Sequence, residues 1–273
     1  MSPGFLRHFL LICQFELTRL FFTRKGLLYL ITFTFVWCFI LFYPLRYTAD
    51  ILAQEKNVAA GGSLLDFMGW GSLLHWHIPT LAVYWHFALI IFPILTIFTS
   101  ADQTCSDRER GTLRFLGLRA SRNVLFFGRF AGTMLSHALL VVITLLSTVA
   151  VTVYQDATLF ASAFNSAAAI MVNLLIVLLP FTAMMAVLST TVKSARQATI
   201  WAILIWSFLA GIISLLSVYL PALGHLEVLI PGYQMATLSQ LSQWQAIQLA
   251  YIPLLQSVVL LSLGCWIMHR KKL

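Results

Sequence analysis

The sequence has 273 residues, of which 60% are hydrophobic and only 10% are charged. Soluble globular domains carry about 25% charged residues, so this composition excludes that class. A mean hydropathy of +0.89 and repeated uncharged runs of ~20 residues are typical of a polytopic helical membrane protein. The net charge of +8 does not indicate nucleic-acid binding, because the basic residues flank the apolar runs, as topology-setting charges do.

The N-terminal residues 3–22 mix charged and bulky apolar side chains. This mixture is typical of an amphipathic helix that lies in the membrane interface. Residues 45–78 form a long loop, in which we expect a helix over 48–57 and a Trp-rich interfacial segment over 64–76. Hydropathy predicts six membrane spans, at 27–43, 79–99, 131–154, 163–188, 198–220 and 247–268.

Residues 221–245 are too apolar for a free loop and too rich in Pro and Gly for a full span. We interpret them as a short re-entrant hairpin of two half-helices, which membrane proteins tolerate where protein covers the broken backbone. The sequence therefore predicts a single all-α transmembrane domain over residues 1–273, with an interfacial helix, six spans and a re-entrant hairpin before the last span.

The stretch from 100 to 129, called the basic loop below, carries nine charged residues between two apolar runs. Ser106 and Glu109 have the spacing of a capping box, which predicts a short helix that begins at Asp107. Gly117 is expected to loosen its end, and Ser121 to cap a second helix that leads into the next span. The charged loop alone is also compatible with a role only in topology.

The basic loop resembles the cytoplasmic loop of type-2 ABC transporter permeases. Those proteins typically read E-R-E-x-G-T-L, then a Pro-x-S-R turn, then G-K before the next span; this chain has D-R-E-R-G-T-L over residues 107–113. Ala120 stands where Pro is common, and Arg129 replaces the usual Lys. The small six-span size looks most like the bacterial permeases of the nitrous-oxide-reductase maturation and gliding-motility groups.

The resemblance implies a permease subunit, with an export direction expected, that is driven by a separate ATPase bound at residues 106–129. ATP and Mg would belong to that partner, and this chain itself would hold no cofactor and carry no catalytic residue. A second permease copy, identical or closely related, is also implied. As a hypothesis, the ATPase contact consists of Glu109, Arg110 and Gly111, supported by Arg108, Arg114 and Arg122.

The distribution of basic residues predicts the sidedness. Fifteen of the 17 Lys and Arg residues fall on the side that holds both termini and the basic loop, and only Arg46 and Lys56 fall on the other. Basic residues concentrate in cytoplasmic loops. We therefore expect both termini and the basic loop in the cytoplasm of a bacterium, with the spans in its inner membrane.

The chain lacks the groups that other energy sources need. It contains no G-x-x-x-x-G-K-[ST] motif for nucleotide phosphates, and its predicted spans contain no Asp, Glu, Lys or Arg, which ion-coupled transporters use at mid-membrane. The four Cys residues are scattered and indicate neither a disulfide framework nor a metal site. Gly128 and Gly132 form a small-x-x-x-small pair, a pattern that occurs often by chance.

Two alternatives stay open at this stage. The first is a non-transporting membrane protein that holds haem or copper through His75, His77 and His86, although few histidines at different depths make a weak metal site. The second keeps the permease fold but passes the motion of the ATPase to a periplasmic partner. The transported substrate does not follow from the sequence.

Overall fold

The computed structural model describes residues 3–43, 76–219, 226–241 and 243–270. All regular structure in these ranges is helical, and they contain no strand. The α-helices are α1 (Pro3–Phe22), α2 (Arg24–Phe42), α5 (Pro79–Thr99), α6 (Cys105–Glu109), α7 (Thr112–Arg119), α8 (Arg122–Gln155), α9 (Phe160–Thr191), α10 (Ala195–Tyr219), α11 (Met235–Gln240) and α12 (Tyr251–Arg270). The 3-10 helices are η2 (Ser100–Asp102), η3 (Ala157–Leu159) and η5 (Gln243–Leu249). The helix predicted over residues 48–57 lies outside these ranges, as does all of the interfacial segment predicted over 64–76 except its last residue.

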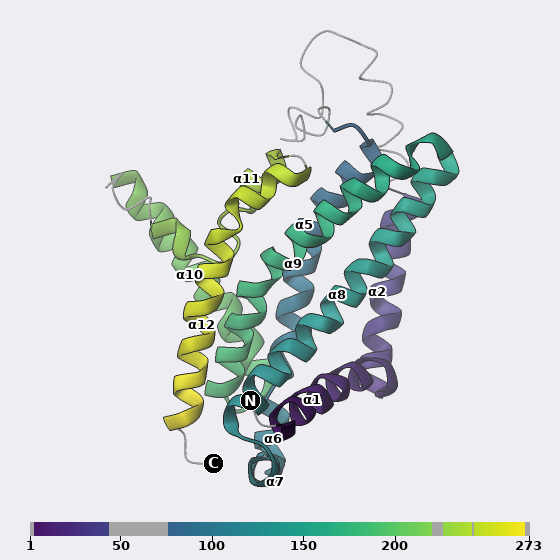
Figure 1. Cartoon of the computed structure of the whole chain (residues 1–273). Helices are drawn as coiled ribbons and strands as arrows, with labels where there is room; N and C mark the ends of the chain where they lie inside the picture. Colours follow the sequence, from purple (N-terminus) through teal and green to yellow (C-terminus); the bar gives the residue numbers. More distant parts are fainter. Residues whose placement is uncertain (1–2, 44–75, 220–225, 242, 271–273) are drawn as a thin grey trace.

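The fold is a bundle of membrane-length helices. Five stretches are long and apolar enough to cross a membrane, namely Pro79–Glu109, Arg122–Gln155, Ala157–Thr191, Ala195–Leu216 and Tyr251–Arg270. The helix pair Arg7–Phe22 and Gly26–Phe42 adds a sixth if the two, bent by 67° at their junction, are counted as one span. The predicted all-α class is confirmed with five to six candidate spans. The N-terminus, α1, α6, α7 and the end of α12 lie at one end of the bundle, the basic end (Figure 1).

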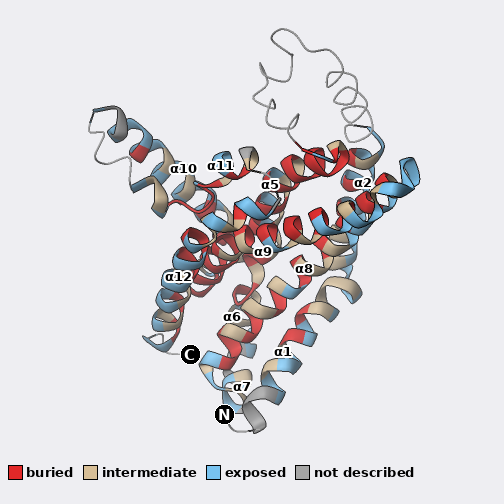
Figure 2. Cartoon of the chain, turned by 45° about the horizontal axis from the view of Figure 1, so that its top comes forward, coloured by how far each residue is buried: buried red, intermediate tan, exposed pale blue. Residues whose placement is uncertain are grey.

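The centre of the bundle is α9, which contacts α5, α8, α10 and α12. It is apolar on all sides, as a helix surrounded by other helices must be. Its Phe181 and Leu174 are fully buried beside Trp85 and Phe92 of α5. Helix α10 is the opposite case, since most of its apolar side chains are exposed and it extends away from the bundle (Figure 2).

Hydroxyl groups join α5 to α8 through the depth of the bundle. Thr80 pairs with Thr152 at 2.7 Å, and the Tyr84 hydroxyl pairs with the hydroxyl of Thr144 at 3.0 Å. Buried polar groups of this kind hold transmembrane helices together where lipid supplies no hydrophobic force between them. The α5–α8 contact therefore needs no charged residue at mid-membrane.

Helix α1 lies across the basic end and contacts α8 along much of its length (Figure 1). The contact is close at two glycines of α8. A Cβ on Gly132 would lie 2.8 Å from Cβ of Glu16 and 3.1 Å from Cα of Cys13, and one on Gly128 would lie 3.1 Å from the Ile12 side chain. The small-x-x-x-small pair is thus the surface on which α1 packs.

The described part of the segment before the last span contains less helix than two half-helices. Leu226–Leu229 forms a 3-10 turn, Gly232 follows with φ +89°, and α11 has only six residues. Pro231 and Gly232 separate this turn from α11, because neither residue type sustains helical hydrogen bonding. Side chains of the bundle bind the interrupted backbone: Trp85 donates to the Leu238 carbonyl at 3.1 Å, and Gln256 donates to the Ile230 carbonyl at 3.2 Å.

The α1–α8 contact gives a first prediction. Gly132→Leu should lower the thermal stability of the purified protein, because the added side chain must displace Glu16 or the α1 backbone. Overpacking of this kind costs about 1–3 kcal/mol. Gly211→Leu is the matched control, since a Cβ at Gly211 on α10 meets no atom within 4 Å. Equal melting temperatures for the two variants would show that the α1–α8 contact contributes little.

Candidate coupling site

The basic loop forms two short helices separated by Gly111. Gly111 has φ +70°, a left-handed conformation that favours glycine, and it ends α6 and begins α7. The predicted single helix with a loosened end at Gly117 is therefore wrong: α7 continues through Gly117, and the break lies six residues earlier. The side chains or backbone of Glu109, Arg110 and Gly111 are exposed at this turn.

The predicted capping box at Ser106 is also wrong. Helix α6 begins at Cys105, and the carboxylate of Asp102 accepts the Ser106 backbone N–H at 2.9 Å. The reason is η2, which directly precedes α6 and places Asp102 where a capping acceptor is needed. The second predicted cap is confirmed, since Ser121 accepts the Val124 N–H at 3.4 Å and α8 begins at the next residue.

Helix α6 is fixed to the end of α9 by Arg108. Its guanidinium donates to the carbonyls of Ser189 at 3.1 Å, Val192 at 3.0 Å and Thr190. The last carbonyls of a helix have no intrahelical partner and carry partial negative charge. An Arg supplies the missing hydrogen-bond donors and also balances this charge. Cys105 lies in the same contact, fully buried, with its thiol 3.4 Å from the Ser189 carbonyl.

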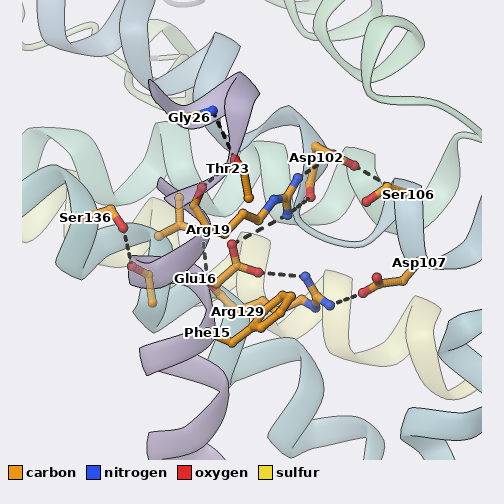
Figure 3. A network of polar contacts seen from close by, with 12 residues as sticks. Phe15, Glu16, Arg19, Thr23, Gly26, Asp102, Ser106, Asp107, Arg129 and Ser136 are labelled. Carbon is orange, nitrogen blue, oxygen red and sulfur yellow. Dashed lines mark hydrogen bonds and ion pairs between the residues drawn. The ribbon is translucent and has the colours of Figure 1, made fainter. Parts of the chain in front are cut away.

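Five charged side chains from α1, η2, α6 and α8 form an ionic cluster. Its members are Glu16, Arg19, Asp102, Asp107 and Arg129 (Figure 3). Arg129 of α8 bridges two of the carboxylates: it donates to Glu16 at 2.6 Å and pairs with Asp107. Arg19 of α1 pairs with Asp102, donates to its carbonyl at 2.8 Å and lies 3.6 Å from Glu16. Arg129 is 4% exposed and Glu16 is 8% exposed.

The cluster ties α1, α6 and α8 together at one point. A buried guanidinium loses its hydration, so it is stable only with carboxylates in good geometry around it. The ring of Phe15 adds to this environment, with the guanidinium carbon of Arg129 6.0 Å from its centroid. A displacement of α6 must therefore move Asp107 with it and pull on α8 and α1.

Sequence reasoning missed this cluster. From the sequence, Glu16 and Arg19 are only two of the charged residues of the predicted interfacial helix, and Arg129 only stands where the type-2 permeases usually have Lys. The local signal is the pair Glu16 and Arg19, which have opposite charge and the spacing i, i+3 on one helix. No local pattern shows that their partners lie in the basic loop, 83 to 113 residues further along the chain.

The six predicted contact residues separate into three groups. Arg108 and Arg122 bind helix ends within the chain; Arg122 donates to the carbonyls of Met268 at 3.3 Å and His269 at 2.9 Å. Glu109, Arg110 and Gly111 are exposed at the turn between α6 and α7. The Arg114 side chain lies outside the described part of the structure.

The histidines proposed as metal ligands do not form a cluster within the described residues. His86 is buried in α5, His77 is exposed just before that helix, and His75 lies outside the described ranges. Over those ranges, no three His, Cys, Asp or Glu residues come together in a way that could hold a metal ion. The structure therefore supplies no argument for the haem or copper alternative.

The helical bundle and its basic loop agree with a family match. Residues 20–268 match the family described as ABC-2 family transporter protein, so the chain belongs to it. It is a multi-pass membrane permease component of an ABC-2 type transporter. Members of this family have no catalytic activity themselves; they associate with ABC ATPase subunits, which hydrolyse ATP separately. No curated protein matches the chain with significance.

The ionic cluster gives a second prediction. Arg129→Gln should destabilise the protein by about 3–5 kcal/mol, because it leaves two carboxylates without their shared cation. Arg129→Lys should recover only part of this loss, since an ammonium lacks the planar fork that serves two carboxylates. Thermal unfolding in detergent measures both effects. Arg196→Gln on the exposed start of α10 is the control, and a similar loss in that variant would contradict the role of the cluster.

Proposed function

We propose that the turn and helix formed by residues 109–118 are the contact through which an ABC ATPase drives this permease. The supporting observation is the contrast between this segment and helix α6, which leads into it. Helix α6 is fixed to α9 by the Arg108 hydrogen bonds and to α8 by the Asp107–Arg129 ion pair, and Arg129 continues the contact to Glu16 of α1. The segment itself is largely exposed at the basic end of the bundle, where a soluble subunit could approach it.

The outer side has the composition of a protein interface. Phe115 is 73% exposed and Leu118 is 84% exposed, and their i, i+3 spacing puts them on one face of α7. Glu109 and Arg110 border this apolar pair at the preceding turn. An apolar centre with a charged rim is the usual arrangement at a protein–protein contact. The predicted contact residues Glu109, Arg110 and Gly111 thus keep their role in this proposal, and Phe115 and Leu118 are added as the apolar centre of the contact.

Arg108 and Arg122 take a different role in this proposal. They do not touch the ATPase but transmit its movement, because each binds the terminal carbonyls of another helix. A push on α7 reaches α9 through Arg108 and reaches α8 and α1 through Asp107 and the ionic cluster. The turn at Gly111 allows the ATPase surface to come near the backbone, since no Cβ stands there.

The wider proposal concerns the assembly and its membrane. The basic end faces the cytoplasm of a bacterium, and the spans lie in its inner membrane. Two copies, or one copy with a close relative, pair with two ATPase subunits that hold ATP and Mg. The exposed apolar side chains of α10 support such pairing, because they form a surface against which the helices of a second permease could pack. Export is the direction that the resemblance to type-2 permeases favours.

The ATPase contact gives a third prediction. In co-expression with candidate ABC ATPases, Phe115→Ser combined with Leu118→Ser should weaken ATPase binding by about 30-fold or more, because two apolar anchors at an interface centre are lost. Affinity capture through the permease, followed by native mass measurement of the complex, reports both binding and the two-plus-two composition. The fold should be retained, since neither side chain is buried.

The matched control for this test carries Tyr154→Ser and Phe160→Ser. These side chains are 93% and 59% exposed at the opposite end of the bundle, so the control removes similar apolar surface away from the basic end. Full ATPase capture by the Phe115 and Leu118 variant would overturn the proposed contact. Equal loss of ATPase capture in both variants would show that the substitutions impair membrane insertion rather than the ATPase contact.

Sidedness gives a fourth prediction. Native Cys105 is unsuitable for labelling because it is fully buried. We instead expect Leu118→Cys to react with a membrane-impermeant thiol reagent in inverted vesicles, and Tyr154→Cys to react in right-side-out vesicles. Both variants carry Cys38→Ser and Cys265→Ser, which remove the thiols that are not buried. The reverse labelling pattern would place the basic end outside the cell and exclude the ATPase contact.

A further inference from the structure

A cavity of about 540 Å³ lies beside the ionic cluster. It is bounded by the junction of α1 and α2, the end of α5, and the facing parts of α6 and α8. Its volume falls within the range of small-molecule sites, roughly 300–1,000 Å³. The cavity opens near the basic end and is separate from the exposed face of α7.

Apolar and charged side chains both line the cavity. Tyr29 of α2, Phe98 of α5 and Leu140 of α8 contribute rings and an aliphatic side chain. Arg24 and Arg110 also line it and are themselves exposed. A ligand with a polar head and an apolar remainder would match this mixed lining.

The charge balance favours an anionic head. All three carboxylates that line the cavity, those of Glu16, Asp102 and Asp107, already pair with Arg19 or Arg129. Within the described residues, Arg24 and Arg110 have no carboxylate within ion-pair distance. Two guanidinium groups are thus available to an incoming anion, and guanidinium matches phosphate by paired hydrogen bonds.

One further feature favours an anion. The N-terminus of α2, capped by Thr23, lies at the cavity, and a helix N-terminus attracts negative charge. His137 also lines the cavity and is 2% exposed, but its Nε2 pairs at 2.8 Å with Thr99, whose hydroxyl already donates to the Leu95 carbonyl. The Nε2 therefore carries the proton, and the Nδ1 is left as a hydrogen-bond acceptor that gives no attraction to an anion.

We propose that this cavity binds an anionic phospholipid from the leaflet at the basic end. The phosphate lies between Arg24 and Arg110, near the first turn of α2, and the start of an acyl chain lies along Phe98 and Leu140. A free phosphate would satisfy the arginines but leave the apolar lining uncovered. Arg110 also belongs to the proposed ATPase contact, so the inference is tested on the isolated permease, where no ATPase competes for this residue.

The test uses the full chain purified in a neutral detergent and depleted of lipid. Phosphatidylglycerol, phosphatidylcholine with the same acyl chains, and inorganic phosphate are added in turn, and bound lipid and melting temperature are measured. We expect phosphatidylglycerol to bind at least ~10-fold more tightly than phosphatidylcholine and to raise the melting temperature, while inorganic phosphate does neither. Equal binding of the two lipids would overturn the proposal, and stabilisation by phosphate alone would assign the site to a soluble anion.

Variants locate the binding. Arg24→Gln combined with Arg110→Gln should abolish the preference for phosphatidylglycerol, and Arg24→Gln alone should reduce it. The control combines Arg7→Gln with Arg196→Gln, which removes two exposed arginines outside the cavity. Retained preference in the Arg24 and Arg110 variant, or equal loss in the control, would show only general attraction of lipid to a basic surface. Because no ATPase is present, failure here leaves the proposed function untouched.

Discussion

The arrangement of the basic end depends on the burial of Arg129. A guanidinium removed from water at the end of α8 requires carboxylates close by, and Glu16 and Asp107 supply them from two other helices. This requirement fixes where α1 crosses α8 and how deeply α6 is held. The pairing of Arg19 with Asp102 then fixes η2 against α1. The position of the exposed helix α7 follows from these contacts, because only the short turn at Gly111 separates it from α6.

The polar contacts between helices differ between the interior of the bundle and its basic end. In the interior, α5 and α8 meet through neutral hydroxyls such as those of Tyr84 and Thr144. At the basic end, the helices meet through ion pairs, because nearby water and lipid headgroups lower the free-energy cost of a charged side chain. The interior therefore keeps the helices together at little electrostatic cost, and the end provides stiff, directional contacts.

The sequence predicts the helical class and the approximate number of spans, because uncharged runs of ~20 residues have few other structures available to them. It also predicts the cap at Ser121, which depends on residues three positions apart. It does not predict the cap at Asp102, where an intervening 3-10 helix changes the register, or the ionic cluster, whose members are far apart in the chain. The six proposed contact residues share one loop, yet Arg108 binds the last carbonyls of α9 whereas Arg110 is exposed. Which side of a short helix each Arg occupies depends on tertiary contacts.

The contact between Gly132 and Glu16 links two kinds of interaction that are usually independent. The absent side chain at Gly132 leaves the space in which Glu16 reaches Arg129. A larger side chain at Gly132 on α8 would therefore also disturb the ion pairs of the cluster. The changes in the free energy of unfolding caused by substitutions at Gly132 and Glu16 should be strongly non-additive, because neighbouring residues that share a partner do not contribute separately. A substitution at Gly132, Glu16 or Arg129 changes the environment of the other two, so the effect of each depends on the residues present at the others.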